Sequence, residues 1–345
     1  MRVLIVADVV GGVRTFVDEL TRGLAGRDVE VHLALLGASA PAAARAAASC
    51  QVRDLKLEWM PEPWADVEAT GSWVAELVSR HRPDLVHMNT FAPVLDPHVP
   101  VLLTVHSCVL TWWRAVHGTA APAGWDRYRA LAGNALKRAD ALCVPTRALR
   151  DELGAVYPEL PIASVIPNGR ALRPARGVAR ERLVVSVGRV WDEAKNVRLL
   201  AQAAPAIDGR VAVIGPGPAP AGVEHLGALA PEAVSAWLTR AAVFAEPARY
   251  EPFGLAALEA ALCGCALVLG DIPSLREVWD GAASYVSPGD ADALAHIVNS
   301  LLDDPVRARR AGNAAHARAA RYTPGAMAKA YLHTYREVAH TAVPA

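Results

Sequence analysis

The sequence lacks an excess of either charge and has little cysteine. Lys and Arg together number 35, as do Asp and Glu, so the formal net charge is zero. Binding nucleic acid through bulk electrostatics needs a basic surface, and this composition argues against a nucleic-acid partner. The five cysteines are an odd number without a tight pairing pattern, which excludes a disulfide framework and predicts reduced thiols in the cytoplasm.

Long hydrophobic runs are also missing. The most apolar stretch, 255–269, is interrupted by Glu259 and Gly264, so no membrane-spanning helix is predicted. The N-terminal apolar run ends at Asp8 and is too short for a secretory signal. We therefore expect a cytoplasmic protein. The Arg-rich segment 306–321 is typical of a solvated helix face, and contact with an anionic membrane is the alternative, so at most peripheral membrane association is expected.

What the sequence does contain is two successive sets of strand-length apolar runs alternating with helical periodicity. A chain of 345 residues, 53% of them apolar, is long enough for two domains with sizeable cores. Segment 170–182 has no apolar periodicity and is the predicted linker. The pattern predicts an α/β fold of two doubly wound Rossmann-like domains that face a central cleft. The predicted strands are 2–7, 29–36, 84–88, 101–105, 141–144, 162–166, 183–188, 210–215, 242–246 and 266–270.

Two glutamates flank a predicted helix start in the second half. Glu251 and Glu259 lie eight residues apart, with Phe253 and Gly254 between them. A helix that begins near Phe253 would offer its first N–H groups to an anion and place one carboxylate at its mouth. The alternatives are that Glu251 only favours the helix dipole and that Glu259 is a surface residue.

This segment carries a family resemblance. RYEPFGLAALEAALCG (249–264) resembles the E-x7-E signature of retaining glycosyltransferases with the GT-B fold, specifically family 4. Further motifs follow the order of that family, and the resemblance extends from about residue 2 to 336. These motifs are TVHS (104–107), RADALCVPTRALRDEL (138–153), VIPNG (165–169) and VVSVGRVWDEAKN (184–196).

The resemblance implies an enzyme that moves a sugar from a nucleotide-diphosphate sugar to an acceptor hydroxyl with retention of configuration. A UDP-sugar is favoured and a GDP-sugar is possible, with no metal and no cofactor apart from this co-substrate. The acceptor is a small molecule, a lipid-linked molecule or a glycan. The implied domains are an acceptor domain, 1–170, joined by a C-terminal helix at about 325–345, and a donor domain, 171–324. The oligomeric state is not indicated.

The resemblance also implies roles for residues of the donor domain. Arg189 and Lys195 would bind the donor diphosphate, and they follow strand 183–188, where ligands of open α/β sheets bind. Their spacing of six is one longer than in many members, and surface salt bridging is the alternative. Glu251 would contact the transferred sugar and Glu259 the nucleotide ribose. The backbone at Phe253, Gly254 and Leu255 would hold donor hydroxyls and phosphate.

In the acceptor domain the resemblance places His106 near the reacting carbon, and a purely structural histidine is the alternative. Many members carry an acid after this histidine; Ser107 stands here, so no carboxylate base is assigned. Gly12 lies in a turn that lets the backbone approach the donor or acceptor, or that only joins a strand to a helix. Trp112, Trp113 and His117 form a candidate acceptor wall by stacking, with helix packing or a dimer contact as the competing explanation.

Two metal-like patterns are explained more simply. Asp290-Ala291-Asp292 matches a D-x-D motif but opens a predicted helix, where an N-cap is expected. Cys263 and Cys265 have no second pair at zinc spacing.

Two rival functions remain open, a nucleotide-sugar epimerase on the same fold and a non-catalytic nucleotide-sugar-binding subunit. Retention of Arg189, Lys195 and both signature glutamates argues against a degenerate, non-catalytic copy.

Overall fold

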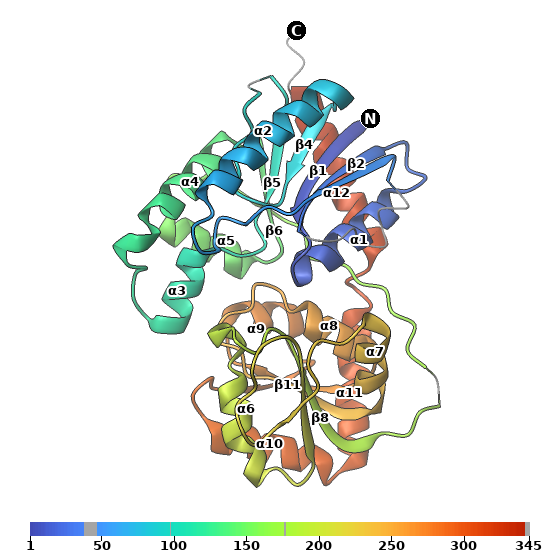
Figure 1. Cartoon of the computed structure of the whole chain (residues 1–345). Coiled ribbons are helices and arrows are strands. Elements are labelled where there is room, and N and C mark those ends of the chain that lie inside the picture. Colours follow the sequence, from blue (N-terminus) through green and yellow to red (C-terminus); the bar gives the residue numbers. More distant parts are fainter. Residues whose placement is uncertain (38–46, 97, 176, 342–345) are drawn as a thin grey trace. The chain divides into compact units, whose positions relative to one another are not determined.

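The computed structural model describes residues 1–37, 47–96, 98–175 and 177–341, which form two compact units. One unit comprises 1–114, 118–169 and the C-terminal segment from 324, and the other comprises 170–323 with 115–117. Each unit is built on one parallel sheet (Figure 1). The prediction of two Rossmann-like domains is confirmed. The cleft between them stays a prediction.

The first unit contains a seven-stranded parallel sheet in the order β3-β2-β1-β4-β5-β6-β7. The predicted apolar runs become its strands because parallel strands covered on both faces need apolar side chains throughout. The edge strand β3 was not predicted, since its half-buried residues form no apolar run. The strands are β1 (Arg2–Asp8), β2 (Glu30–Leu36), β3 (Ser49–Arg53), β4 (Leu85–Met88), β5 (Val101–Thr104), β6 (Ala141–Val144) and β7 (Ser164–Val165).

Helices α1 (Gly12–Leu24) and α12 (Pro324–Thr341) pack together and cover one face of this sheet. Figure 1 shows α2 and α4 on the other side of the sheet. A buried polar contact joins α12 to the sheet: His87 Nδ1 lies 2.7 Å from the Tyr335 hydroxyl, and His87 Nε2 lies 2.8 Å from Thr104 Oγ1. The remaining helices are α2 (Trp64–His81), α3 (Val109–His117), α4 (Asp126–Arg138) and α5 (Arg147–Val156).

The second unit contains a six-stranded parallel sheet in the order β10-β9-β8-β11-β12-β13. The four inner strands match the predicted runs, whereas β10 and β13 are short edge strands without an apolar run and were not predicted. The strands are β8 (Glu181–Val187), β9 (Arg210–Ile214), β10 (Glu224–His225), β11 (Ala241–Glu246), β12 (Ala266–Gly270) and β13 (Ser284–Val286).

Two hydrophobic cores lie on the two faces of this sheet. One is lined by α7 (Pro231–Arg240), α8 (Leu255–Leu262), α9 (Pro273–Trp279) and part of α11 (Pro305–Ala319). The other is lined by α6 (Val197–Ala203) and α10 (Ala291–Leu302).

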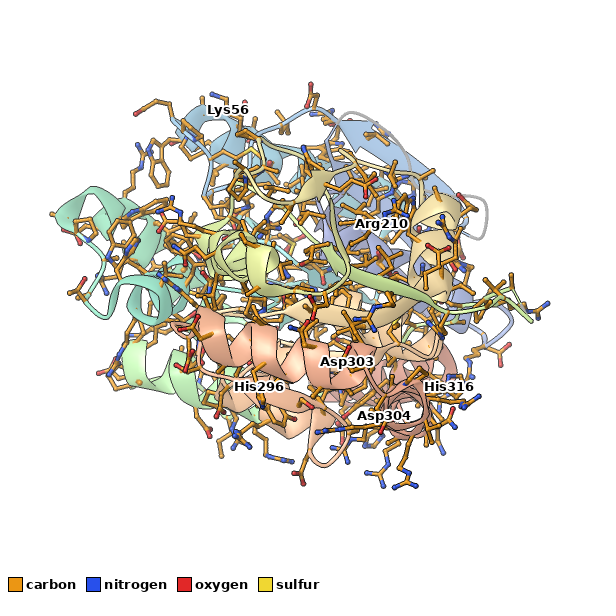
Figure 2. All side chains as sticks on the ribbon, turned by 90° about the horizontal axis from the view of Figure 1, so that it is seen from below. Lys56, Arg210, His296, Asp303, Asp304 and His316 are labelled. Carbon is orange, nitrogen blue, oxygen red and sulfur yellow. The ribbon has the colours of Figure 1, made fainter. Side chains whose placement is uncertain are left out.

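The helical tail of the chain is divided by side-chain caps and prolines. Asp304, labelled in Figure 2, accepts hydrogen bonds from the N–H groups of Val306 and Arg307 and so caps α11. The predicted breaks at Pro305 and Pro324 are confirmed, because each proline opens a helix. The predicted C-terminal helix is described to residue 341, and 342–345 lie outside the described residues. No helix in the described ranges combines the length and apolar character needed to cross a bilayer.

Candidate active site

The strand order of the second unit reverses between β8 and β11, two neighbouring strands in the middle of the sheet. Such a switch point leaves a crevice at the carboxyl ends of the strands, where open α/β sheets bind ligands. Gly188 and Arg189 follow β8 directly, and β11 ends in Glu246. The carboxyl ends of both strands therefore place charged side chains at the switch point.

The central feature of this switch point is a lysine held between two carboxylates. Lys195 ends the 3₁₀ helix η3 (Glu193–Lys195), and its Nζ donates to Glu246 Oε1 at 2.7 Å and to Glu251 Oε2. The side chains are 17%, 1% and 13% exposed for Lys195, Glu246 and Glu251, respectively. Sequence reasoning missed Glu246. The available signal was a charge at the end of the otherwise apolar run 242–246.

The loop backbone fixes where Lys195 points. Asp192 accepts from the N–H of Ala194 at 3.0 Å and caps η3. Asn196 then adopts a left-handed conformation, with φ 54°, and its amide donates to the carbonyls of Pro247 at 2.9 Å and Pro288 at 2.8 Å. These bonds tie the Lys195 loop to the ends of β11 and β13.

The electrostatics of the three groups are coupled. Burial alone would lower the pKa of Lys195, but the charges of Glu246 and Glu251 outweigh it and hold that pKa above its ordinary value. Burial raises the pKa of Glu246 to about 7, despite the nearby ammonium. For Glu251, burial acts in the same direction, but Lys195 and backbone N–H donors prevail and lower the pKa. Near neutral pH, Glu251 is therefore ionised and Glu246 titrates.

Arg189 lies on the same loop and is paired separately. Its Nη2 donates to the buried Asp192 carboxylate at 2.5 Å, and its guanidinium carbon lies 5.4 Å from the centre of the half-exposed Trp191 ring. Its Nε is buried and has no hydrogen-bond partner within the part of the chain that the structure describes. The predicted cation pair thus shares one loop, and each cation already faces a carboxylate.

Helix α8 begins at Leu255, so the predicted start near Phe253 is wrong by two residues. Gly254 precedes the helix with φ 88°, a left-handed conformation that glycine tolerates. The N–H of Gly254 donates to Glu251 Oε1 at 2.9 Å, so a side chain of the site already uses one of the N–H groups predicted to bind an anion. The Phe253 side chain is buried in the core, edge-on to Tyr322.

The second signature glutamate has a different cation. Glu259 Oε1 accepts from Arg170 Nε at 2.7 Å, and the two side chains are 18% and 12% exposed. Sequence reasoning placed Arg170 at the start of the linker and gave it no role. The structure thus brings Lys195 and Glu251 into contact and pairs Glu259 with Arg170.

In the first unit, His106 follows β5 and is half-buried. The amide of Asn89 donates to the Val6 carbonyl at 3.1 Å, which turns its Oδ1 toward His106 Nε2 at 2.9 Å. Burial lowers the pKa of His106 to about 4, so the ring is neutral at physiological pH, with its proton on Nε2. The ring of Phe16, on α1, packs edge-on against it, with centroids 4.5 Å apart.

The other predicted residues of the acceptor side lie at helix starts and on α3. Gly12 is the first residue of α1 and follows Gly11, whose φ is 59°. Trp112 and Trp113 are half-buried neighbours on α3 with ring centroids 6.1 Å apart, and His117 is exposed at the end of that helix.

The D-x-D pattern has a structural role. The Asp290 side chain accepts from the N–H of Ala293 at 2.8 Å and caps α10, as predicted. Cys263 and Cys265 are both buried free thiols.

Comparison with known proteins assigns both halves of the chain. Residues 10–172 match the model described as Glycosyltransferase Family 4, and residues 181–304 match the model described as Glycosyl transferases group 1. The chain belongs to glycosyltransferase family 4. The resemblance of the motifs to this family is therefore confirmed.

The relatives of this glycosyltransferase are matched to different extents. It is 28% identical over 311 residues to the alpha-maltose-1-phosphate synthase of Mycolicibacterium smegmatis. This match covers 74% of this chain and 79% of the relative. The first curated relatives are matched over shorter stretches, and there the chain spans only 20–28% of their length.

Solved structures show that this glycosyltransferase has the GT-B fold. Sucrose-phosphate synthase from Thermosynechococcus elongatus superposes with a TM-score of 0.82 and 18% identity, covering 99% of this chain and 100% of that chain. HepE of Anabaena, solved in complex with UDP-glucose, superposes with a TM-score of 0.75 and 18% identity, covering 98% and 100%.

Proposed function

We propose that this glycosyltransferase transfers a sugar from a nucleotide-diphosphate sugar, most readily a UDP-sugar, to an acceptor hydroxyl with retention of configuration. The observation that carries the proposal is the position of Lys195, held by Glu246 and Glu251 at the switch point of the second sheet, with Arg189 on the same loop. A switch point with two cations suits a pyrophosphate.

The proposed reaction needs no metal. The bond between the anomeric carbon and the phosphate oxygen breaks, and its electron pair leaves with the nucleoside diphosphate. The acceptor oxygen bonds to the anomeric carbon on the same face, and its proton passes to the leaving diphosphate. Charge develops on that diphosphate, where Arg189 and Lys195 would stabilise it. Each contact is worth about 2.7–4 kcal/mol by analogy with one oxyanion-hole donor.

The remaining donor roles are those that the family resemblance implies, and contacts in the second unit support them. Glu251 sits beside Lys195 and would bond the transferred sugar, with its orientation fixed by the Gly254 N–H. Glu259, held by Arg170, would bond the ribose. The backbone at Leu255, where α8 begins, would contribute N–H groups to the donor.

The acceptor side would be supplied by the first unit together with His117, which clusters with the second unit. His106 would place a hydrogen bond or its backbone carbonyl near the reacting carbon, and Gly12 would let the backbone approach the substrates. Trp112, Trp113 and His117 would line the acceptor, which is a small molecule, a lipid-linked molecule or a glycan. UDP is favoured because a protein of the same fold, HepE, was solved with UDP-glucose.

The test is transfer by a Glu251→Gln variant compared with the wild-type enzyme. Donor consumption is assayed in EDTA with UDP-glucose, UDP-N-acetylglucosamine and GDP-mannose, each with a panel of acceptors, and the anomeric configuration of the product is read by NMR. We expect a loss of at least about 100-fold in kcat with UDP binding largely kept.

Glu193→Gln is the matched control, because Glu193 is an exposed carboxylate in η3, the 3₁₀ helix that carries Lys195. It should keep its turnover. Full activity of Glu251→Gln would remove Glu251 from the mechanism. An inverted product, or a dependence on added metal, would refute the corresponding part of the proposal. Formation of an epimerised nucleotide sugar without an acceptor would favour the rival epimerase.

A further inference from the structure

The charges at the switch point do not match the proposed ligand when all of them are ionised. Among the ion-paired side chains there, Arg189 and Lys195 contribute +2, and the carboxylates of Asp192, Glu246 and Glu251 contribute −3, so these five groups sum to −1. A nucleoside diphosphate is strongly anionic, and like charges held close together repel. Binding would therefore be favoured by removal of one negative charge from the cluster.

The hydrogen bonds identify which carboxylate can give up its charge most easily. Asp192 accepts from the Ala194 N–H and from Arg189. Glu251 accepts from the Gly254 N–H and from Lys195.

Glu246 is 1% exposed and accepts a hydrogen bond from Lys195 through Oε1. Its Oε2 is buried and has no hydrogen-bond partner in the described residues. Since a buried carboxylate with an orphan oxygen is poorly stabilised, a proton costs least at this position.

The groups that face Glu246 act in opposite directions, because the Lys195 ammonium lowers its pKa and the Glu251 carboxylate raises it. Lys195 approaches it from η3 and Glu251 from the turn that precedes α8, and Glu251 raises the pKa of Glu246. Beyond the neighbouring strand β12, Asp271 is neutralised by Arg276, with Nη2 and Oδ2 2.7 Å apart. An incoming diphosphate would add negative charge on the same side as Glu251.

We propose that Glu246 takes up one proton when a nucleoside diphosphate binds. The Lys195 ammonium is then balanced by Glu251 alone and can interact with the ligand. This inference rests on the proposed function and deepens it, because it makes donor binding and product release depend on a proton held inside the protein. Glu246 is here a positioning residue that acts through Lys195.

The proton linkage predicts a specific pH dependence. Burial raises the pKa of Glu246 to about 7, so the free enzyme holds this proton below neutral pH and lacks it above. In the wild type, the Kd for UDP should rise toward about tenfold per pH unit above pH 7, as linkage to one proton requires. Glu246→Gln carries no charge at any pH, so its Kd should stay nearly constant from pH 7 to 9.

The experiment is isothermal titration calorimetry of the full chain with UDP, GDP and ADP. Each titration is run at pH 7, 8 and 9 in two buffers of different ionisation enthalpy, which counts the protons taken up. We expect uptake that approaches one proton at pH 8 for the wild type and close to none for Glu246→Gln. Glu152→Gln is the matched control, because burial also raises the pKa of Glu152 to about 7, and Glu152 lies on α5 in the first unit. It should titrate like the wild type.

The outcomes separate this inference from the proposed function. Nucleotide binding without proton uptake by the wild type, or with equal uptake by Glu246→Gln, overturns the role of Glu246 and leaves the transferase proposal standing. If no nucleoside diphosphate binds at any pH, both fall together. The proton count of the wild type tests the proposal even if the variant does not fold.

Discussion

Replacing Lys195 by Met tests the electrostatic core of the site most directly. Methionine keeps most of the length of the lysine stem and removes the ammonium, which leaves Glu246 and Glu251 facing each other without a cation. Removing one partner of a buried ion pair costs about 3–5 kcal/mol of unfolding free energy. Because the Lys195 side chain is only 17% exposed, solvent screening reduces this cost little.

The cost should depend on pH with a definite sign. Without Lys195, the pKa of each glutamate rises, since the ammonium is the charge that lowers both. A carboxyl whose pKa in the folded protein lies above its unfolded value of 4.5 loses stability as the pH rises through that window. Lys195→Met should therefore cost the full amount at pH 8 and less than half of it at pH 5.

Urea unfolding followed by circular dichroism at pH 5, 6, 7 and 8 measures this cost. The double variant Lys195→Met/Glu246→Gln should recover part of the lost stability at pH 8, because it removes one of the two opposed charges. Lys137→Met is the control: its ion pair with Glu159 is solvent-exposed, so its loss should be small at every pH. The reasoning is refuted if Lys195→Met costs the same at pH 5 and pH 8.

Two further predictions concern groups that sequence reasoning missed. Asn89→Asp puts a carboxylate 2.9 Å from His106 Nε2, and should raise the pKa of His106 from about 4 toward its ordinary value and move the acid limb of the pH–rate profile upward. NMR titration of the ring measures this, and an unchanged titration contradicts it. Arg170→Met releases Glu259 and should weaken UDP binding by about 10- to 100-fold, since hydrogen bonds to charged groups contribute about 1.5–3 kcal/mol. Unaltered UDP affinity in calorimetry would exclude a nucleotide role for that pair.

The sequence was sufficient to predict most of the fold, because the inner strands of both sheets are continuous apolar runs. The edge strands β3, β10 and β13 were not predicted, since a strand with one solvated side does not need a continuous run of apolar residues. The start of α8 was misplaced because local spacing does not reveal the left-handed backbone at Gly254.

For the candidate site, the sequence predicted several of the residues but not the side chains that contact them. The motif pointed to Lys195 and Glu251, but it gave no sign that Glu246 also binds the lysine. Lys195 and Glu246 are 51 positions apart in the sequence and meet because β8 and β11 are neighbours in the sheet. The same holds for Asn89, which contacts His106 from the end of an adjacent strand. Local patterns identify chemistry, and pairing across strands needs the three-dimensional register.

The place of α12 has a consequence for synthesis of the chain. Its residues Met327, Tyr331 and Tyr335 complete the hydrophobic core that begins at Val3, so that core needs both ends of the described chain. On the ribosome, residues 170–323 can fold as soon as they emerge, whereas the face of the N-terminal sheet that α1 and α12 share stays only partly covered until α12 is released. The half translated first is thus the half that finishes folding last, and it is the one most exposed to chaperones in between.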